Sequence, residues 1–147
     1  MVWNVYLSGE IHSDWRTQIM QQSQELDLPI NFSSAVIDHQ ASDAAGDMLG
    51  EESNAYWRDH KSAKVNAIRT RKLLSECDLA IIRFGPQYKQ WNAAFEAGYC
   101  CALDIPYITL HDEPLVHPLK EVDAGALAWG KSVNEVLAVL QYVVRDA

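Results

Sequence analysis

The chain has 147 residues, 48% of them hydrophobic, and its 12 basic and 20 acidic side chains give a formal charge of −8. This length and composition predict one globular domain with a substantial core. The negative charge disfavours nucleic acid polymers and anionic membranes as partners, because both repel an acidic surface. A small molecule is therefore the expected ligand.

The chain begins without the basic segment of a signal peptide, and its apolar stretches fall short of the roughly 18 residues that span a membrane. We therefore expect a cytoplasmic protein.

The three cysteines, Cys77, Cys100 and Cys101, have no metal-ligand spacing, so we expect reduced core thiols and no metal site. For Cys77, at a helix-to-strand junction, the alternative is a nucleophile.

Apolar runs of strand length alternate with segments of helical period along most of the chain. The expected strands are residues 2–8, 28–32, 79–84, 105–110 and 126–129, and the expected helices are residues 14–26, 61–76, 91–103 and 133–145. The second helix would direct Val65, Ile68 and Leu73 inward. The last helix opens with Ser132 and Glu135, which form a capping-box pattern.

Unbroken apolar strands are typical of parallel sheets that are covered by helices on both faces. Five such strands alternating with helices predict an α/β fold: a single-domain doubly wound (flavodoxin-like) five-stranded parallel sheet in the order 2-1-3-4-5. Ligands of such sheets bind beyond the carboxyl ends of the strands, which places the pocket near residues 84–92.

Residues 35–60 interrupt this alternation, because they are rich in Asp, Glu, Ser and Gly and show no clear strand or helix repeat. A connection of this length is either a lid over the pocket or a flexible insert, and both interpretations stay open. Its side chains that suit binding or chemistry are Asp38, His39, Asp43, Tyr56, Trp57 and His60.

The expected helix at residues 91–103 is apolar around nearly its whole circumference and carries one carboxylate, Glu96, a turn after Asn92. A charge on such a helix costs several kcal/mol unless it is paired or used. The arc expected to pack most tightly runs through Trp91, Ala94, Phe95, Gly98 and Ala102. Glu96 is thus either a functional carboxylate beside the pocket or a residue stabilised by the helix dipole, Arg69 or Arg71.

The first expected strand ends in Ser8-Gly9-Glu10-Ile11-His12, where glycine permits a tight turn and backbone amides can approach a ligand. The alternative is an ordinary strand-to-helix turn with Ser13 as N-cap. The sequence contains neither GxGxxG nor GxxxxGK[ST], so nicotinamide and ATP chemistry lose support and we expect no cofactor.

Four motifs resemble the nucleoside 2-deoxyribosyltransferase-like superfamily: YLSG at residues 6–9, Asp78, FEAGY at residues 95–99 and ALDIP at residues 102–106. The segments SGEIHSDWR, DHQASDAAGDMLGEE, NAIRT, QYKQWNAA and HPLKE further resemble the YtoQ family of small bacterial proteins. The resemblance covers essentially the full length. It implies that residues 1–147 form a single deoxyribosyltransferase-like domain, with a lid at residues 35–60 as one interpretation of the long connection.

In this superfamily the carboxylate that matches Glu96 attacks the anomeric carbon of a nucleoside sugar and forms a glycosyl-enzyme. An Asp that often protonates the leaving base is replaced here by Thr70, and residues 90–93, QWNA, replace the usual D-x-G-T. The candidates for the missing proton donor are Asp38, His39 and Asp43. The substrate-binding residues that follow from the resemblance and the pocket position are Tyr6, Gly9, Glu10, Ile11, His12, Asp38, Arg69, Asn92 and His117.

The loop of Gly9 to His12 would line the sugar or phosphate side of the pocket. Glu10 in that loop disfavours phosphate, whereas His12 and Arg69 would offset its charge. His117 follows the fourth strand, where related proteins contribute residues across a dimer interface. A homodimer is therefore implied by the resemblance.

The leading hypothesis is an N-glycosidase or deoxyribosyltransferase that cleaves the N-glycosidic bond of a nucleoside or nucleotide through Glu96. The alternative is a non-catalytic module that binds a nucleotide or nucleotide-derived ligand in the same cleft, and Thr70 favours it. A third interpretation is a hydrolase or lyase that acts on another small metabolite through Asp38, His39 and Glu96.

Overall fold

A computed structural model describes residues 1–145 and contains one five-stranded sheet in the order β2-β1-β3-β4-β5, in which every neighbouring pair is parallel. This confirms the predicted α/β fold. The strands are β1 (Trp3–Gly9), β2 (Ile30–Ser34), β3 (Leu79–Arg83), β4 (Tyr107–Leu110) and β5 (Ala128–Gly130). The helices are α1 (Trp15–Glu25), α2 (His39–Asp43), α3 (Ala55–Glu76), α4 (Trp91–Ala102), α5 (Lys120–Gly125) and α6 (Val133–Val144), with short 3-10 turns η1 (Asp47–Leu49) and η2 (Glu113–Leu115).

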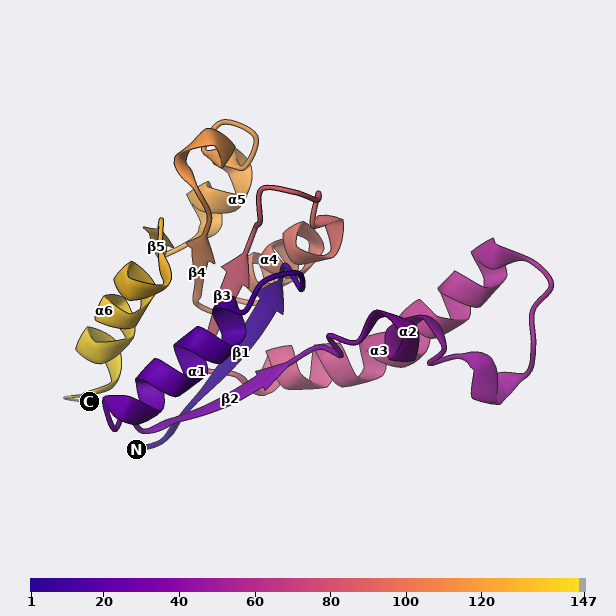
Figure 1. The fold of residues 1–147 in the computed structure, drawn as a ribbon, viewed down its shortest axis with the longest axis horizontal. Coiled ribbons are helices and arrows are strands. Elements are labelled where there is room, and N and C mark those ends of the chain that lie inside the picture. The colour runs from indigo at the N-terminus through magenta and orange to yellow at the C-terminus, as the bar shows by residue number, and fades with distance from the viewer. Residues whose placement is uncertain (146–147) are drawn as a thin grey trace.

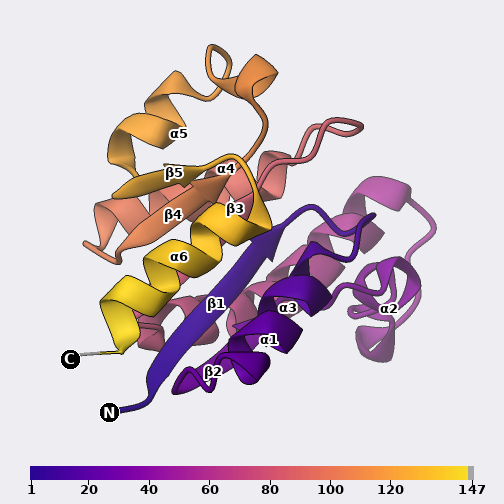
Figure 2. The same cartoon turned by 60° about the vertical axis from the view of Figure 1, so that its left-hand side comes forward.

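Helices cover both faces of the sheet (Figure 1). Alternation along β1 sends Val5 and Leu7 to one face, where α1 and α6 pack, and Tyr6 to the other, where α3 and α4 pack. In Figure 2, α6 and α1 flank β1, and residues of both helices pack with Val5 and Leu7. Both expected core layers are therefore present, and Tyr6 and Ser8 belong to the layer of α3 and α4.

Two strands begin later than predicted because proline precedes them. Pro29 and Pro106 have no backbone N–H to donate to a neighbouring strand, so β2 begins at Ile30 and β4 at Tyr107. The fifth strand is also displaced, to Ala128–Gly130. The predicted hydroxyl cap of α6 is confirmed, because the Ser132 side chain accepts from the Glu135 N–H.

The expectation of no repeat in residues 35–60 is wrong, because the segment contains α2, η1 and the first turns of α3. Asn54 caps α3, its side chain accepting from the Tyr56 N–H at 2.8 Å. Figure 1 shows this part of α3 projecting beyond the sheet. Its side chains are mostly exposed, so they carry no apolar period, and the predicted inward Ile68 is 74% exposed.

The predicted packing face of α4 is also wrong, since Trp91 is 71% and Phe95 66% exposed. The buried face consists of Ala93, Ala97 and Cys100. These small side chains let the helix approach a sheet face that is already filled by large residues such as Tyr6 and Tyr107. Glu96 borders this buried face.

The end of β1 requires glycine at position 9. Gly9 has φ +104°, and a Cβ there would lie 2.0 Å from the Arg83 carbonyl oxygen of β3. The Glu10 N–H donates to that same carbonyl at 3.0 Å. The loop that follows β1 is thus held directly against the end of β3.

Candidate functional site

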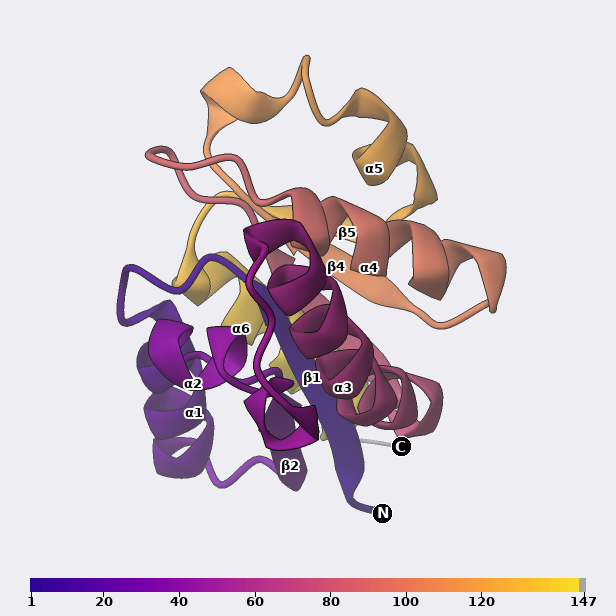
Figure 3. The same cartoon turned by 90° about the vertical axis from the view of Figure 1, so that its right-hand side faces the viewer.

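A groove of about 830 Å³ lies at the carboxyl end of β1, between α3 and α4. In Figure 3 the projecting part of α3 faces the viewer, with α4 beside it and β1 behind. The groove takes its floor from the end of β1, its walls from the two helices, and its ends from the loops after β1, β2 and β3. This is the predicted position for a ligand site in a parallel sheet.

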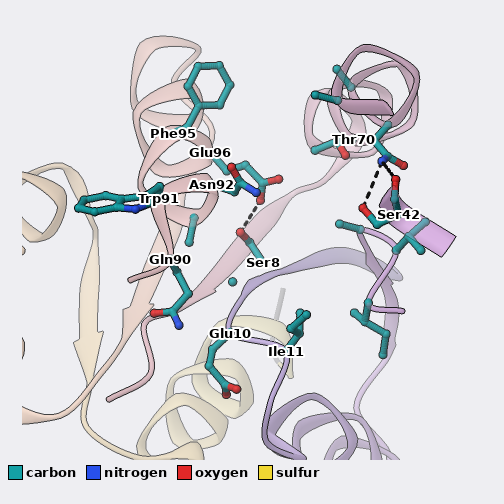
Figure 4. Close-up of a pocket in the computed structure, with 18 of the residues that line it drawn as sticks. Ser8, Glu10, Ile11, Ser42, Thr70, Gln90, Trp91, Asn92, Phe95 and Glu96 are labelled. Carbon is teal, nitrogen blue, oxygen red and sulfur yellow. Dashed lines mark hydrogen bonds between the residues drawn. The ribbon is translucent and has the colours of Figure 1, made fainter. Parts of the chain in front are cut away.

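Glu96 enters the groove from the second turn of α4 and is half-buried. The hydroxyl of Ser8, at the end of β1, donates a hydrogen bond to its Oε2 atom (Figure 4). Burial raises the pKa of the Glu96 carboxyl, while the Ser8 hydrogen bond, the positive charge of Arg16 and the Tyr6 hydroxyl lower it. The Ser8 hydroxyl therefore fixes one oxygen of the carboxylate. The carboxylate as a whole is largely shielded from water.

Tyr6 lies under the groove and is fully buried. Burial, then the charge of Glu96, raises the pKa of its hydroxyl, so the hydroxyl stays protonated. The hydroxyl is close enough to Glu96 and Thr70 to be affected by both. No hydrogen bond of good geometry joins it to any of the described residues 1–145, which leaves an unpaired buried donor beside the carboxylate.

Arg16, in the first turn of α1, brings a buried positive charge to the same region. Its guanidinium donates to the Glu10 carbonyl at 2.6 Å and to the Gly9 carbonyl at 3.0 Å. The Trp15 indole N–H donates to the Glu10 carbonyl as well, at 2.7 Å. These bonds fix the backbone of the loop and place the cation where it favours ionised Glu96.

The predicted residues Gly9, at the end of β1, and Glu10, Ile11 and His12, in the loop that follows, all line the groove. The Glu10 side chain is buried and accepts from the His12 N–H and from the Ser13 hydroxyl. The His12 ring lies 4.5 Å from the ring of Tyr88, which belongs to the loop after β3. The two loops therefore meet at one end of the groove.

Asn92, Arg69 and Thr70 also line the groove. Figure 4 shows Asn92 directed to the same side of α4 as Glu96, whereas Trp91 and Phe95 are directed away from Glu96. The Arg69 guanidinium donates to the Ser34 carbonyl at 3.4 Å. Thr70, on α3, supplies a hydroxyl on the wall across from α4.

Three predicted site residues are not among those that line the groove: Tyr6, which lies beneath it, Asp38 and His117. Asp38 is exposed and caps α2, its side chain accepting from the Ala41 N–H at 2.7 Å. His117 is exposed in the connection that follows β4. Of the other candidate proton donors, His39 and Asp43 line the groove and face each other at 3.4 Å.

Sequence reasoning missed two residues of the site, Ser8 and Arg16. The alternation of β1 was the available signal for Ser8, because it places Ser8 on the same face as Tyr6. For Arg16 the sequence offers no signal, since its hydrogen bonds go to backbone carbonyls. Asp78, a motif residue, has a structural partner: it accepts from the Asn4 N–H of β1 at 2.8 Å.

The cysteines match their predicted role only in part. Cys100 is buried and Cys77 half-buried, but Cys101 is exposed, because it lies on the outer side of α4. Burial raises the pKa of the Cys77 thiol to about 11, which opposes a role as nucleophile.

Two structural features of residues 1–145 concern the binding of metal ions and membranes. Within residues 1–145, no cluster of three or more His, Cys, Asp or Glu side chains is arranged to hold a metal ion. In the same residues, no helix has both the length and the apolar character needed to cross a bilayer.

The sequence matches a family model described as nucleoside 2-deoxyribosyltransferase YtoQ over residues 6–144. It is 40% identical over 140 residues to the Bacillus subtilis (strain 168) protein described as uncharacterized protein YtoQ, covering 95% of each chain. Two solved structures show a similar fold. A conserved protein from Enterococcus faecalis V583 has a TM-score of 0.66 at 14% identity, covering 97% of this chain and 99% of that one. A 2-deoxyribosyltransferase from Bacillus psychrosaccharolyticus has a TM-score of 0.54 at 16% identity, covering 93% and 95%.

Proposed function

The chain belongs to the family described as nucleoside 2-deoxyribosyltransferase YtoQ, and we propose that it cleaves the N-glycosidic bond of a nucleoside or nucleotide with Glu96 as nucleophile. One observation carries the proposal: a half-buried carboxylate has one oxygen held by Ser8 and lies in a groove of about 830 Å³. That volume is in the range of small-molecule sites. The proposal is also supported by the similar fold of the 2-deoxyribosyltransferase from Bacillus psychrosaccharolyticus.

In the proposed reaction, the free oxygen of Glu96 attacks the anomeric carbon of the sugar. The carbon–nitrogen bond breaks, the base leaves with the electron pair and takes up a proton, and a glycosyl ester forms on Glu96. Water or a second base then attacks the same carbon and releases the carboxylate. Ser8 keeps the other carboxylate oxygen in place, and the Arg16 charge favours the ionised form that the first step needs.

The source of the proton for the leaving base is a separate part of the proposal. Thr70 has no acidic proton, so a nearby ionisable side chain must serve in its place. His39 and Asp43 line the groove from the segment after β2, and we assign the proton transfer to this pair.

The binding of a nucleotide or nucleotide-derived ligand without chemistry is the second candidate function. Thr70 favours it, because a hydroxyl on this wall can hold a base but is a poor acid.

We further propose that the whole chain acts as one domain and that residues 35–60 move as a lid. We also propose that the functional unit is a homodimer.

The test is a panel of ribonucleosides, deoxyribonucleosides and their 5′-monophosphates, with released base measured by chromatography. We expect turnover by the wild type and a loss of about 10³-fold or more in Glu96→Gln. Glu121→Gln, an exposed carboxylate on α5, is the control and should keep full activity. Tight binding without turnover in the wild type would favour the second function, and neither binding nor turnover would overturn both.

A further inference from the structure

The short helix α2 carries the two side chains to which we assign proton transfer, His39 and Asp43. They are four positions apart, so they share one face of the helix, and both line the groove. A helix of only five residues is not stable alone in water. The position of this pair therefore depends on what holds α2 against the rest of the molecule.

Two side chains of α3 hold the carboxyl end of α2. The Ser62 hydroxyl donates to the Asp43 carbonyl at 2.6 Å and accepts from the Gly46 N–H at 3.1 Å. One turn further along α3, the Asn66 amide donates to the Ser42 carbonyl at 3.1 Å and to the Ser42 hydroxyl at 3.2 Å. Figure 4 shows the two hydrogen bonds that end at Ser42. Together these bonds fix the backbone of the last two residues of α2.

The contact between the two segments is close and shielded from water. Ser62 is 3% exposed, and a Cβ built on Gly46 would lie 2.9 Å from the Ser62 backbone nitrogen. The chain after α2 thus lies directly against the backbone of α3. The Arg58–Asp47 ion pair also joins these segments, but it is exposed, and exposed ion pairs contribute little to stability. The buried hydrogen bonds therefore decide where α2 lies.

One face of α3 carries both of these side chains and Thr70. Ser62, Asn66 and Thr70 follow one another at intervals of four residues, and all three line the groove. Thr70 has no acidic proton to give, and the Ser62 proton is already donated to the Asp43 carbonyl. This wall of the groove therefore has no acid of its own at these positions, but it holds in place a segment that carries ionisable side chains.

We propose that Ser62 and Asn66 are positioning residues, which hold the His39–Asp43 pair where it can protonate the departing base. When the carbon–nitrogen bond breaks, the electron pair stays on the base, and a proton passes from the protonated His39 ring to the base. The neutral ring takes a proton back from the water or base that attacks in the second step. Ser62 and Asn66 act only through α2. The inference rests on the proposed function, because it concerns one step of that reaction.

The test is a double-mutant cycle in steady-state kinetics, with a substrate that the nucleoside panel identifies. Ser62→Ala and Asn66→Ala should each lower kcat about thirtyfold and change KM by less than about threefold, because they disturb proton transfer and not ligand binding. In a His39→Ala background, the same two changes should lower kcat by about twofold or less, because the group that they position is gone. A merely structural defect would cost the same factor in both backgrounds.

Ser75→Ala is the matched control. Ser75 lies on the same helix and donates to the Lys72 carbonyl at 2.9 Å, but it is exposed and outside the groove lining. This variant should keep the kcat of its parent in both backgrounds. Thermal unfolding shows which variants are folded, and Asn66→Ala, at a half-buried position, carries the test if Ser62→Ala is not.

Three outcomes would overturn this inference alone: an equal cost in both backgrounds, wild-type kcat in Ser62→Ala and Asn66→Ala, or wild-type kcat in His39→Ala. Each of them leaves Glu96 as the proposed nucleophile. If the wild type turns over no nucleoside or nucleotide, or if Glu96→Gln is as active as the wild type, the proposed function fails and this inference fails with it.

Discussion

Two buried polar clusters lie at the same carboxyl edge of the sheet and differ in how completely they are paired. After β4, the His111 ring lies 2.9 Å from the Asp123 carboxylate and 2.9 Å from the Asp112 carbonyl, and stacks on Trp129. Thr109 donates to the same carboxylate at 2.7 Å. After β1, by contrast, the Glu96 cluster leaves the Tyr6 hydroxyl and the Arg16 Nε atom buried without a partner in residues 1–145.

The difference indicates a structural role for the His111 cluster and supports the functional role proposed for the Glu96 cluster. A fully paired buried network fixes the positions of its elements, here β4, β5 and α5, and has no donor left for a ligand. A buried network with unpaired donors is costly to keep, so it suits a site whose remaining partner arrives with the substrate. The comparison predicts that mutations in the first cluster change stability and mutations in the second change activity.

The largest effect is expected for His111→Ala. It removes a side chain that is 0% exposed and leaves the Asp123 carboxylate with Thr109 as its one remaining partner in this cluster, so the free energy of unfolding should fall by about 3 kcal/mol. Urea denaturation measures this. His117→Ala, the same change at an exposed position, should stay within about 0.5 kcal/mol of the wild type. Equal effects of the two substitutions would show that the paired cluster around His111 does not stabilise the fold.

A smaller effect, on activity, is expected for Ser8→Ala. Because the Ser8 hydrogen bond lowers the pKa of Glu96, its loss should raise that pKa and move the acid limb of the kcat/KM profile to higher pH. We expect kcat to fall about tenfold with little change in KM. Ser33→Ala on β2, outside the groove lining, should leave the profile unmoved. A fall in stability without a shift of the profile would mean that Ser8 is only structural.

The smallest effect concerns the stability of Glu96→Gln and its dependence on pH. Burial raises the Glu96 pKa, so the folded state binds this proton more tightly than the unfolded state. The wild type therefore loses stability as pH rises from about 4, the ordinary Glu value, through the raised pKa. Glu96→Gln should match the wild type at low pH and exceed it slightly at neutral pH, as thermal unfolding at both values would show. A variant that is less stable at neutral pH would make Glu96 a structural residue.

The sequence predicted the parts of the fold whose burial is complete. The strands around Leu7, Ile81 and Ile108 are unbroken apolar runs because helices cover both faces, and α6 has a clear apolar stripe. The first turns of α3 were missed, since a helix that projects into solvent needs no apolar period and is marked only by its Asn54 cap.

The sequence indicated Glu96, at the centre of the candidate site, but not the side chains that contact it. Glu96 is conspicuous as the one charge on an apolar helix. Its bond to Ser8 joins residues that are 88 positions apart, and a pattern along one strand cannot indicate which helix will cross it. The exposure of Trp91 and Phe95 was unpredictable for a related reason: the choice of packing face depends on how much room the sheet leaves.

The proposed covalent bond between Glu96 and the sugar can be trapped and detected by mass spectrometry. The protein is incubated with a nucleoside that the panel shows to be a substrate, or with its 2-fluoro analogue to slow the second step, and is then quenched in acid. We predict that the mass increases by one glycosyl group, that the group maps to the peptide containing Glu96, and that Glu96→Gln shows no increase. A glycosyl group on another residue, or turnover with no covalent adduct under these trapping conditions, would contradict the claim.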